Sequence, residues 1–422
     1  MAELSKSITP IEMRDRGRST AWGPLREPLF RSLWIASVIS YTGTWMQNVG
    51  TGWLMTNLTL SPLMVGLVQA AQSLPVFLVI LPAGALADIV DRRRFLIFTQ
   101  TWMVVAAAAL GVMTIAGVMT PWILLAFTFL MGLGAVVNDP PWQAITPDIV
   151  SPPQLASGIA LNSAGYNVAR AVGPALGGLV IAAAGSGIAF LINAASFFGV
   201  IFFLLRWKNV HDASLPRERM RGAMKTGLQY VKDSRAVQAV LVRTGVFSLS
   251  ASALLAMLPL IARPFGSTGY GAMLGFFGLG ALGGAAALPA LRRMMSIDAL
   301  VAGATVVFAL ATFASGWVGT FWVLSVVLFA AGVAWIFIVA SLNVSAQTMC
   351  PNWVRARALS IYLLVLQGGM AAGSALWGEL ANRYGMAEAM AAAAVGLLLG
   401  LITARTHRLH AEGLGTTAPV SG

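Results

Sequence analysis

Charged residues are scarce in this chain. They make up 10% of its 422 residues, whereas hydrophobic residues make up 58%. Ordinary soluble domains carry roughly 25% charged residues, which cover their water-facing surface. Most of the surface of this chain must therefore face lipid, so composition alone predicts an all-α membrane protein.

Cysteine and histidine are almost missing as well. The single Cys350 excludes a disulfide framework and a cysteine metal site. The three histidines (His211, His407 and His410) lie outside the long apolar runs, which excludes a proton relay through an intramembrane histidine. Nucleotide-binding and catalytic signatures such as G-x-x-x-x-G-K-[ST] and H-E-x-x-H are also missing. We therefore expect no enzyme, no catalytic residue, no metal and no cofactor.

Apolar runs dominate what remains, and about 20 apolar residues suffice to cross a bilayer. The first run begins near Leu33, too far from Met1 for a cleaved signal peptide. Twelve transmembrane helices are predicted, near 31–55, 62–87, 95–117, 121–146, 155–182, 186–206, 236–262, 269–291, 297–316, 320–349, 355–382 and 386–405.

The 27 Lys and Arg residues indicate the orientation. Most of them fall in alternate loops, and such loops stay in the cytoplasm. Both termini are therefore expected in the cytoplasm, and an odd number of helices would break the alternation. The net charge of +12 comes from these short loops and not from one basic face, so nucleic acid is not an expected partner.

Two segments of the chain repeat. Gln143–Val150 resembles Gln347–Val354 at an offset of 204, and Gly84 with Arg92-Arg93 resembles Gly284 with Arg292-Arg293 at an offset of 200. Two parallel six-helix halves with a site at the midplane between them are a common transporter plan. We predict a cytoplasmic segment 1–30, bundles 31–206 and 236–405, a basic linker 207–235 along the lipid surface, and a cytoplasmic tail 406–422.

The segment Gly84-Ala-Leu-Ala-Asp88-Ile-Val-Asp91-Arg92-Arg93-Arg94 closes the second run. It resembles the loop 2–3 signature of the major facilitator superfamily, although that family usually has Gly where Asp91 stands. The resemblance implies that Asp88 and Arg92 form a cytoplasmic latch that favours the outward-open state. Gly84 would allow close helix approach, and Arg93 would help to keep the loop inside. The alternative is a plain positive-inside anchor.

A second motif, Ala169-Arg170-Ala-Val-Gly173-Pro174-Ala-Leu-Gly177-Gly178, lies in the fifth run. It resembles the motif of drug–proton antiporters in the same superfamily, with Ala169 in place of the first Gly. Gly173 and Gly177 share one helix face, and Pro174 frees a carbonyl and bends the helix. We expect a close-packed contact, plausibly with the other half. Ordinary small-residue packing is the alternative.

Five further segments, spread over the chain, form a third pattern. They are Asn138-Asp139-Pro-Pro141-Trp142-Gln143-Ala, Leu258-Pro-Leu-Ile-Ala-Arg263, Pro351-Asn-Trp353-Val-Arg355-Ala-Arg357, Gln367-Gly-Gly-Met370 and Ala375-Leu-Trp377-Gly378. With them, nearly the whole chain resembles one bacterial branch of the superfamily, which includes the enterobactin exporter and related efflux proteins. The resemblance implies export of a small, often amphiphilic molecule powered by the proton gradient, in the cytoplasmic (inner) membrane.

Charged residues inside the runs are the remaining signal, because each costs ~2.5–3.5 kcal/mol to insert and is usually functional. Asp139 and Arg170 are the candidates for proton coupling, at depths that differ by roughly 7–12 Å. A carboxyl group in apolar surroundings holds its proton more readily than one in water. The alternatives are a structural role for Asp139 as the partner of a backbone N–H or a loop arginine, and a clamp on helix carbonyls for Arg170.

Uncharged polar residues outline a substrate cavity, although each alone is more simply interhelical glue. The cavity candidates are Gln47, Asn48, Gln69, Gln72, Asn162, Tyr166, Asn343 and Gln367. The resulting prediction is a monomeric secondary transporter that exports an amphiphilic drug or siderophore by alternating access. An importer or lysophospholipid-type carrier of the same fold is the near alternative, and a non-transporting receptor or assembly protein is the distant one.

Overall fold

The computed structural model describes residues 22–87, 91–207 and 229–403. These residues form eleven long helices, joined by short turns and three 3-10 segments (Gly23–Arg26, Pro152–Gln154 and Arg263–Phe265). The helices are α1 (Pro28–Leu58), α2 (Pro62–Ala87), α3 (Arg92–Ile115), α4 (Pro121–Ile149), α5 (Leu155–Arg206), α7 (Arg235–Ile261), α8 (Gly266–Met294), α9 (Ile297–Ser315), α10 (Phe321–Thr348), α11 (Asn352–Tyr384) and α12 (Met386–Gly400).

Helix α5 joins two of the predicted crossings. Its torsions leave the helical region at Gly185, where φ is 82°, a value that glycine adopts at little cost. Gly385, with φ of 106°, separates α11 from α12 in the same way and lies 200 residues further on, which is one of the repeat offsets. With α5 counted as two segments, the described helices are consistent with twelve crossings. Their ends match the predicted runs closely, except that α12 ends at Gly400 instead of 405.

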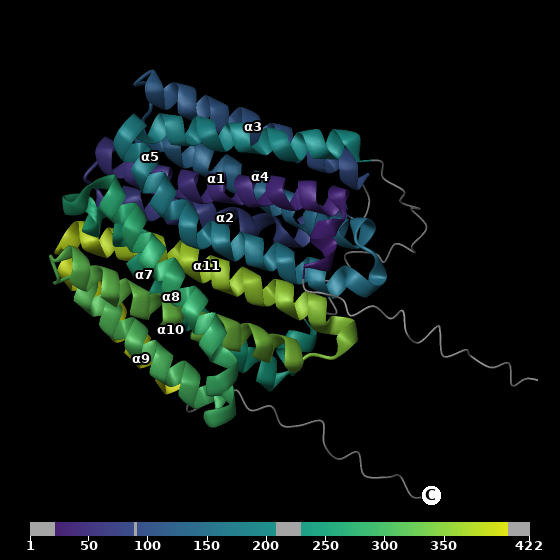
Figure 1. Cartoon of the computed structure of the whole chain (residues 1–422). Coiled ribbons are helices and arrows are strands. Elements are labelled where there is room, and N and C mark those ends of the chain that lie inside the picture. Colours follow the sequence, from purple (N-terminus) through teal and green to yellow (C-terminus); the bar gives the residue numbers. More distant parts are fainter. Residues whose placement is uncertain (1–21, 88–90, 208–228, 404–422) are drawn as a thin grey trace, which may run out of the picture.

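The helices form two groups, which Figure 1 shows one above the other. Helix α5 packs on α1 and α3, and α4 packs on α2 and α3. In the second group, α7 packs on α11 and α12, α8 on α10, and α9 on α10 and α12. Contacts between the groups come mainly from the pairs α2–α11 and α5–α8. The predicted domain limits stay predictions, and most of the predicted linker lies in 208–228, outside the described residues.

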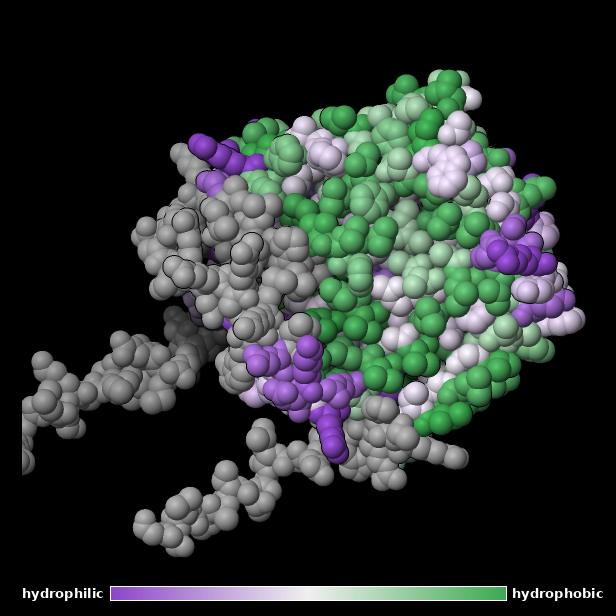
Figure 2. Space-filling model, turned by 180° about the vertical axis from the view of Figure 1, so that it is seen from behind, coloured by the Kyte–Doolittle hydropathy of each residue, from purple (hydrophilic) through white to green (hydrophobic). Residues whose placement is uncertain are grey.

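The outer surface is apolar along the middle of the helices. On α3, Phe98, Val105 and Val112 are each more than half exposed, and their spacing of seven places them on one stripe. Figure 2 shows the same pattern on one face of the molecule, where hydrophobic residues form a broad belt and hydrophilic ones gather towards its edges. This surface suits a lipid environment and would be unusual for a protein in water.

Candidate functional site: a cavity between the two helix groups

The two ends of the molecule, where the helices would leave the membrane, differ in charge. We call the end where α1, α3 and α9 begin the basic side, because Arg31, Arg92–Arg94 and Arg292-Arg293 lie there. We call the end where α1 finishes and α2 begins the opposite side. These two names fix the direction of every helix in the description that follows.

Glycines bring the two groups into backbone contact towards the opposite side. A Cβ atom added to Gly66 of α2 would lie 2.4 Å from the carbonyl oxygen of Ser374 in α11. One added to Gly271 of α8 would lie 2.4 Å from the carbonyl oxygen of Pro174 in α5, and one added to Gly178 would lie 2.6 Å from that of Ser267. These approaches need residues without side chains. Together with Gly378, whose added Cβ would lie 3.0 Å from Leu63 Cα, they form what we call the glycine seal.

A cavity of about 250 Å³ lies between the groups, next to the glycine seal. Its wall combines carboxamides, aromatic rings and aliphatic side chains, a combination that suits a ligand with both polar and apolar parts. The wall is formed by residues of α1, α2, α5, α7, α8, α10 and α11: Trp45, Asn48, Val49, Gly52, Val65, Val68, Gln69, Gln72, Arg170, Pro174, Leu255, Ala256, Pro259, Tyr270, Leu274, Phe277, Gly278, Trp335, Gln367 and Met370.

Arg170 is the one charged residue in this wall, as far as the described residues show. Its guanidinium lies over the indole of Trp45, 5.7 Å from the ring centroid, which is a cation–π contact. Within the described ranges, no carboxylate pairs with it. Pro174 lies one turn further along α5 and has no N–H, so the carbonyl of Arg170 lacks its usual helical donor.

The glycine motif around Arg170 contacts two different neighbours. An added Cβ at Gly173 would lie 2.6 Å from Trp45 Cβ, and one at Gly177 would lie 2.9 Å from Met46 Cα, so both glycines face α1 in the same group. Gly178 faces α8 in the other group. The motif therefore fits α5 between α1 and α8, and the backbone stays helical through Pro174, since the non-helical torsions in α5 are at Gly185.

Asp139 lies on α4 beside two tyrosines. It is close enough to Tyr41 of α1 and Tyr166 of α5 for its charge to act on both phenols. The tyrosine rings meet edge to face with centroids 5.3 Å apart, and Tyr166 also touches Trp45. Asp139 is an exposed residue by its accessible surface, although it lies within the span of α4. It makes no ion pair with Arg170 in the described structure, in keeping with the difference in depth expected from the sequence.

The other polar candidates separate into two sets. Asn48, Gln69, Gln72 and Gln367 line the cavity with Arg170. The remaining residues bind protein groups instead: Gln47 is buried and accepts a hydrogen bond of 2.7 Å from Asn193 Nδ2, Asn162 donates to Thr146 Oγ1 at 2.9 Å, and Asn343 accepts from Gln347 at 2.6 Å. Tyr166 belongs to the cluster around Asp139.

The predicted gate motif is only partly described. Asp88 lies outside the described residues, and Gly84 lies in the last turn of α2. Arg92 pairs with Asp148 at the end of α4, with a distance of 3.4 Å. Arg93 donates to the carbonyls of Leu204 and Leu205 at the end of α5, at 2.6 and 2.7 Å. These arginines therefore hold α3 to α4 and α5 within one group.

Asp91, which replaces the family's usual glycine, has a local role. Its carboxylate accepts a hydrogen bond of 2.8 Å from the backbone N–H of Arg94 and so caps the N-terminus of α3. Side-chain capping of this kind satisfies a backbone donor that the helix itself leaves free. The turn is thus held by a carboxylate where the family pattern would use a flexible residue.

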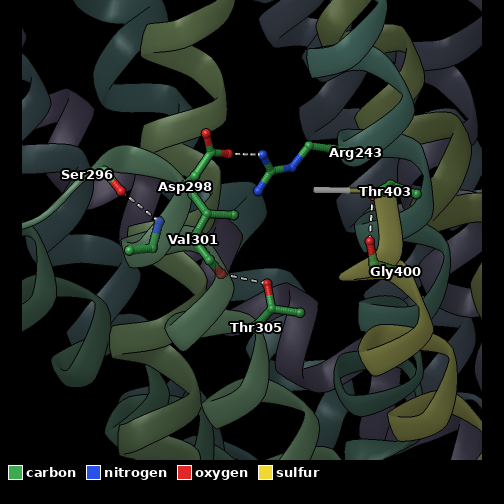
Figure 3. Close-up of polar contacts among 8 residues, drawn as sticks. Arg243, Ser296, Asp298, Val301, Thr305, Gly400 and Thr403 are labelled. Atoms are coloured by element: carbon green, nitrogen blue, oxygen red, sulfur yellow. Dashed lines mark hydrogen bonds and ion pairs between the residues drawn. The ribbon is translucent and has the colours of Figure 1, made fainter. Parts of the chain in front are cut away.

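A different ion pair ties the second group together on the basic side. Arg243 of α7, with its side chain 5% exposed, donates to the Asp298 carboxylate in the first turn of α9. Figure 3 shows this pair between the two helices. Ser296, which caps α9, lies on the Asp298 side of the pair, and Thr403 lies on the Arg243 side. At the end of α8, in the segment that repeats Arg92-Arg93 at an offset of 200, Arg292 donates to Ala340 O and Ser341 Oγ of α10.

Sequence reasoning missed several residues of the site. Trp45, Tyr41 and Trp335 looked like ordinary apolar or interfacial residues, and Gly66 and Gly271 were two among 44 glycines. A signal existed only for the glycines, because Gly271, Gly275 and Gly278 recur at helical spacing and mark a small-residue stripe on α8.

Two helix groups with a cavity between them are a common plan among secondary transporters. The fold of this chain resembles that of the nucleoside transporter NupG, with 13% identity, a TM-score of 0.75 and coverage of 90% of this chain and 100% of that one. It also resembles a bacterial homologue of the human lysosomal transporter Spinster in an inward-facing, occupied conformation, with 14% identity, a TM-score of 0.72 and coverage of 91% and 97%.

Residues 19–417 match the family described as transmembrane secretion effector, so the chain belongs to this family of major facilitator transporters and is not an enzyme. One relative is the staphyloferrin A transporter of Staphylococcus aureus, 26% identical over 171 residues that cover 40% of this chain and only 43% of the relative. Another is the multidrug efflux pump Tap of Mycolicibacterium fortuitum, 24% identical over 407 residues, covering 93% and 98%. The chain therefore belongs to a family of multi-pass membrane transporters.

Proposed function

We propose that this transporter exports a small amphiphilic molecule across the cytoplasmic membrane of a bacterium by proton antiport. The observation that carries the proposal is the cavity around Arg170, which lies between the two helix groups and has both polar and aromatic walls. A carrier that works by alternating access needs such a site between two parts that can move against each other. The relative Tap supports the direction, since it is described as a multidrug efflux pump.

The basic side is the cytoplasmic side in this proposal, because arginine-rich loops stay in the cytoplasm. The glycine seal then closes the cavity towards the outside, and the described conformation faces inward. Both termini are cytoplasmic. The protein works as a monomer, with the proton gradient as its energy source and no cofactor.

Asp139 is our first candidate for the proton carrier. It is a carboxylate within a membrane-crossing helix, and its charge acts on Tyr41 and Tyr166. Intramembrane carboxylates commonly mark proton paths in transporters. Arg170 is the second candidate for coupling, since it lies on the same face of α5 as Tyr166, one turn away.

Efflux from cells tests the proposal. Cells that express the transporter are loaded with three fluorescent amphiphiles in turn, an anion (fluorescein), a cation (rhodamine 123) and a neutral dye (Nile red). Efflux of at least one dye should exceed that of cells without the gene, and a protonophore should abolish the excess. Asp139→Asn should lose gradient-driven efflux, because the amide cannot take up and release a proton.

Asp233→Asn is the matched control, since Asp233 is exposed on the basic side away from the cavity. Efflux that persists without a proton gradient would show that proton coupling is wrong. Normal gradient-driven efflux by Asp139→Asn would remove that residue from the mechanism and leave the exporter proposal standing.

A further inference from the structure

Arg170 occupies the middle of its membrane crossing. It lies fifteen residues after Leu155, where α5 begins, and fifteen before the break at Gly185. At 1.5 Å per residue, the guanidinium is attached about 22 Å from either end. A charge at this depth is costly unless a partner group or the water of a cavity compensates it.

The protein supplies only part of that compensation. The Trp45 ring covers one face of the guanidinium. A guanidinium carries five N–H donors in its plane, and no carboxylate of the described residues meets them. The nearby Tyr166 is a neutral phenol, and Asp139 makes no ion pair with Arg170. Arg170 therefore lines the cavity without an anionic partner among the described residues.

The rest of the wall favours a partner with two different ends. The side chains of Asn48, Gln72 and Gln367 make no hydrogen bond to other described residues, so their amide N–H groups can turn to a ligand. Phe277 and Trp335, whose ring centroids lie 6.3 Å apart, offer an apolar surface on the other group of helices. Planar guanidinium groups bind carboxylates by two parallel hydrogen bonds.

We propose that the central cavity selects amphiphilic anions, with a carboxylate or similar anionic group on Arg170 and an apolar body against Phe277 and Trp335. This inference rests on the proposed function, in that the cavity is the transport site, and it names the class of substrate. It also gives Arg170 a direct role in binding. Cationic amphiphiles should bind poorly, because no carboxylate lines this cavity in the described residues.

Binding can be measured without transport. The full-length protein in lipid nanodiscs is dialysed against three matched probes that share a naphthylbutyl body: 4-(1-naphthyl)butyrate, its neutral amide and the corresponding trimethylammonium cation. Empty nanodiscs correct for partitioning into lipid, and chloride is present throughout. We expect the carboxylate to bind about 30-fold more tightly than the amide, as for a close buried charge pair, and the cation to bind most weakly.

Variants assign the preference to Arg170. Arg170→Gln should bind the carboxylate and the amide equally, and its retained affinity for the amide shows that it is folded. Arg170→Lys keeps the charge but not the planar fork, so it should keep part of the preference. Arg263→Gln, which removes an exposed arginine on the opposite side, should behave as the wild type.

Two results would overturn the inference. The first is a wild type that binds the carboxylate and the amide equally, as it would if chloride alone occupied Arg170. The second is an Arg170→Gln variant that still prefers the carboxylate. The proposed function fails separately. If efflux does not depend on the proton gradient while the nanodisc preference is present, export by antiport is wrong and the anion site stands.

Discussion

The glycine seal makes the strongest prediction about conformational change. In Gly271→Ala, the added Cβ would lie 2.4 Å from Pro174 O, 2.9 Å from Gly178 Cα and 3.0 Å from Gly178 N. All three atoms belong to the backbone, so no side chain can turn away to make room. Overpacking of this kind costs about 1–3 kcal/mol. Since the cost falls on the closed seal, the ratio of opposite-open to opposite-closed molecules should rise by about 5- to 150-fold.

Thiol labelling measures this ratio. A cysteine placed at Gln69 in the cavity wall reacts with a membrane-impermeant maleimide, added from the opposite side, only when the seal is open. The native Cys350 is 3% exposed, and burial raises the pKa of its thiol, so it contributes little reaction near neutral pH. A Cys350→Ser version checks this background. Labelling at position 69 should accelerate several-fold or more in Gly271→Ala.

Gly283→Ala is the matched control, because Gly283 lies on the same helix and an added Cβ there meets no atom within 4 Å. Both substitutions change helix propensity equally, so their difference isolates the steric effect. If Gly271→Ala labels at the same rate as Gly283→Ala and the wild type, the contact between α5 and α8 does not close the cavity, and the reasoning from backbone distances is refuted.

Three further predictions concern stability. Asp298→Ala should lower the thermal unfolding temperature in detergent, because it removes a carboxylate that pairs with the buried Arg243. Breaking a buried pair costs up to ~3–5 kcal/mol, and the effect should be smaller here because the Asp298 side chain is 25% exposed. Asp91→Ala should cost about 0.5–2 kcal/mol locally and speed amide hydrogen exchange in the first turn of α3. Gln47→Leu should destabilise by roughly 0.6–1.7 kcal/mol through its lost bond to Asn193 and leave the affinity for naphthylbutyrate unchanged.

Each of the three has an outcome that contradicts it. An Asp298→Ala protein as stable as Arg263→Ala would mean that the ion pair adds nothing to the second group. Unchanged exchange at the start of α3 would remove the capping role of Asp91. A Gln47→Leu protein of normal stability and weakened probe binding would place Gln47 in the cavity after all.

The fold could be predicted because the membrane leaves few choices. Each crossing needs about 20 apolar residues in a helix, so the lengths of the runs locate α1 to α12 almost directly. The two segments that repeat at offsets of 200 and 204 residues similarly predicted that the chain consists of two six-helix halves. The partners of individual residues could not be predicted in this way. Arg92 finds Asp148 across 56 residues of chain, and only the packing of α3 against α4 decides that.

The site was harder because neighbouring polar residues point in different directions. Gln47 and Asn48 are adjacent in α1, but successive residues turn by about 100° around a helix. One of them meets Asn193 and the other lines the cavity. The sequence identifies both as polar intramembrane residues, and it contains no information on which face of α1 meets α5. The helix packing decides their roles.

The glycine seal also bears on how fast the cavity can open. A barrier made of large side chains can admit a molecule when a few rotamers change, within picoseconds to nanoseconds. The contacts at Gly66, Gly178 and Gly271 join backbone to backbone, so no rotamer change can separate them. Whole helices must move, and such collective motions take microseconds to milliseconds. The rate at which the glycine seal opens is therefore tied to the movement of one helix group against the other, and in the proposed transport cycle this would limit leakage through the seal.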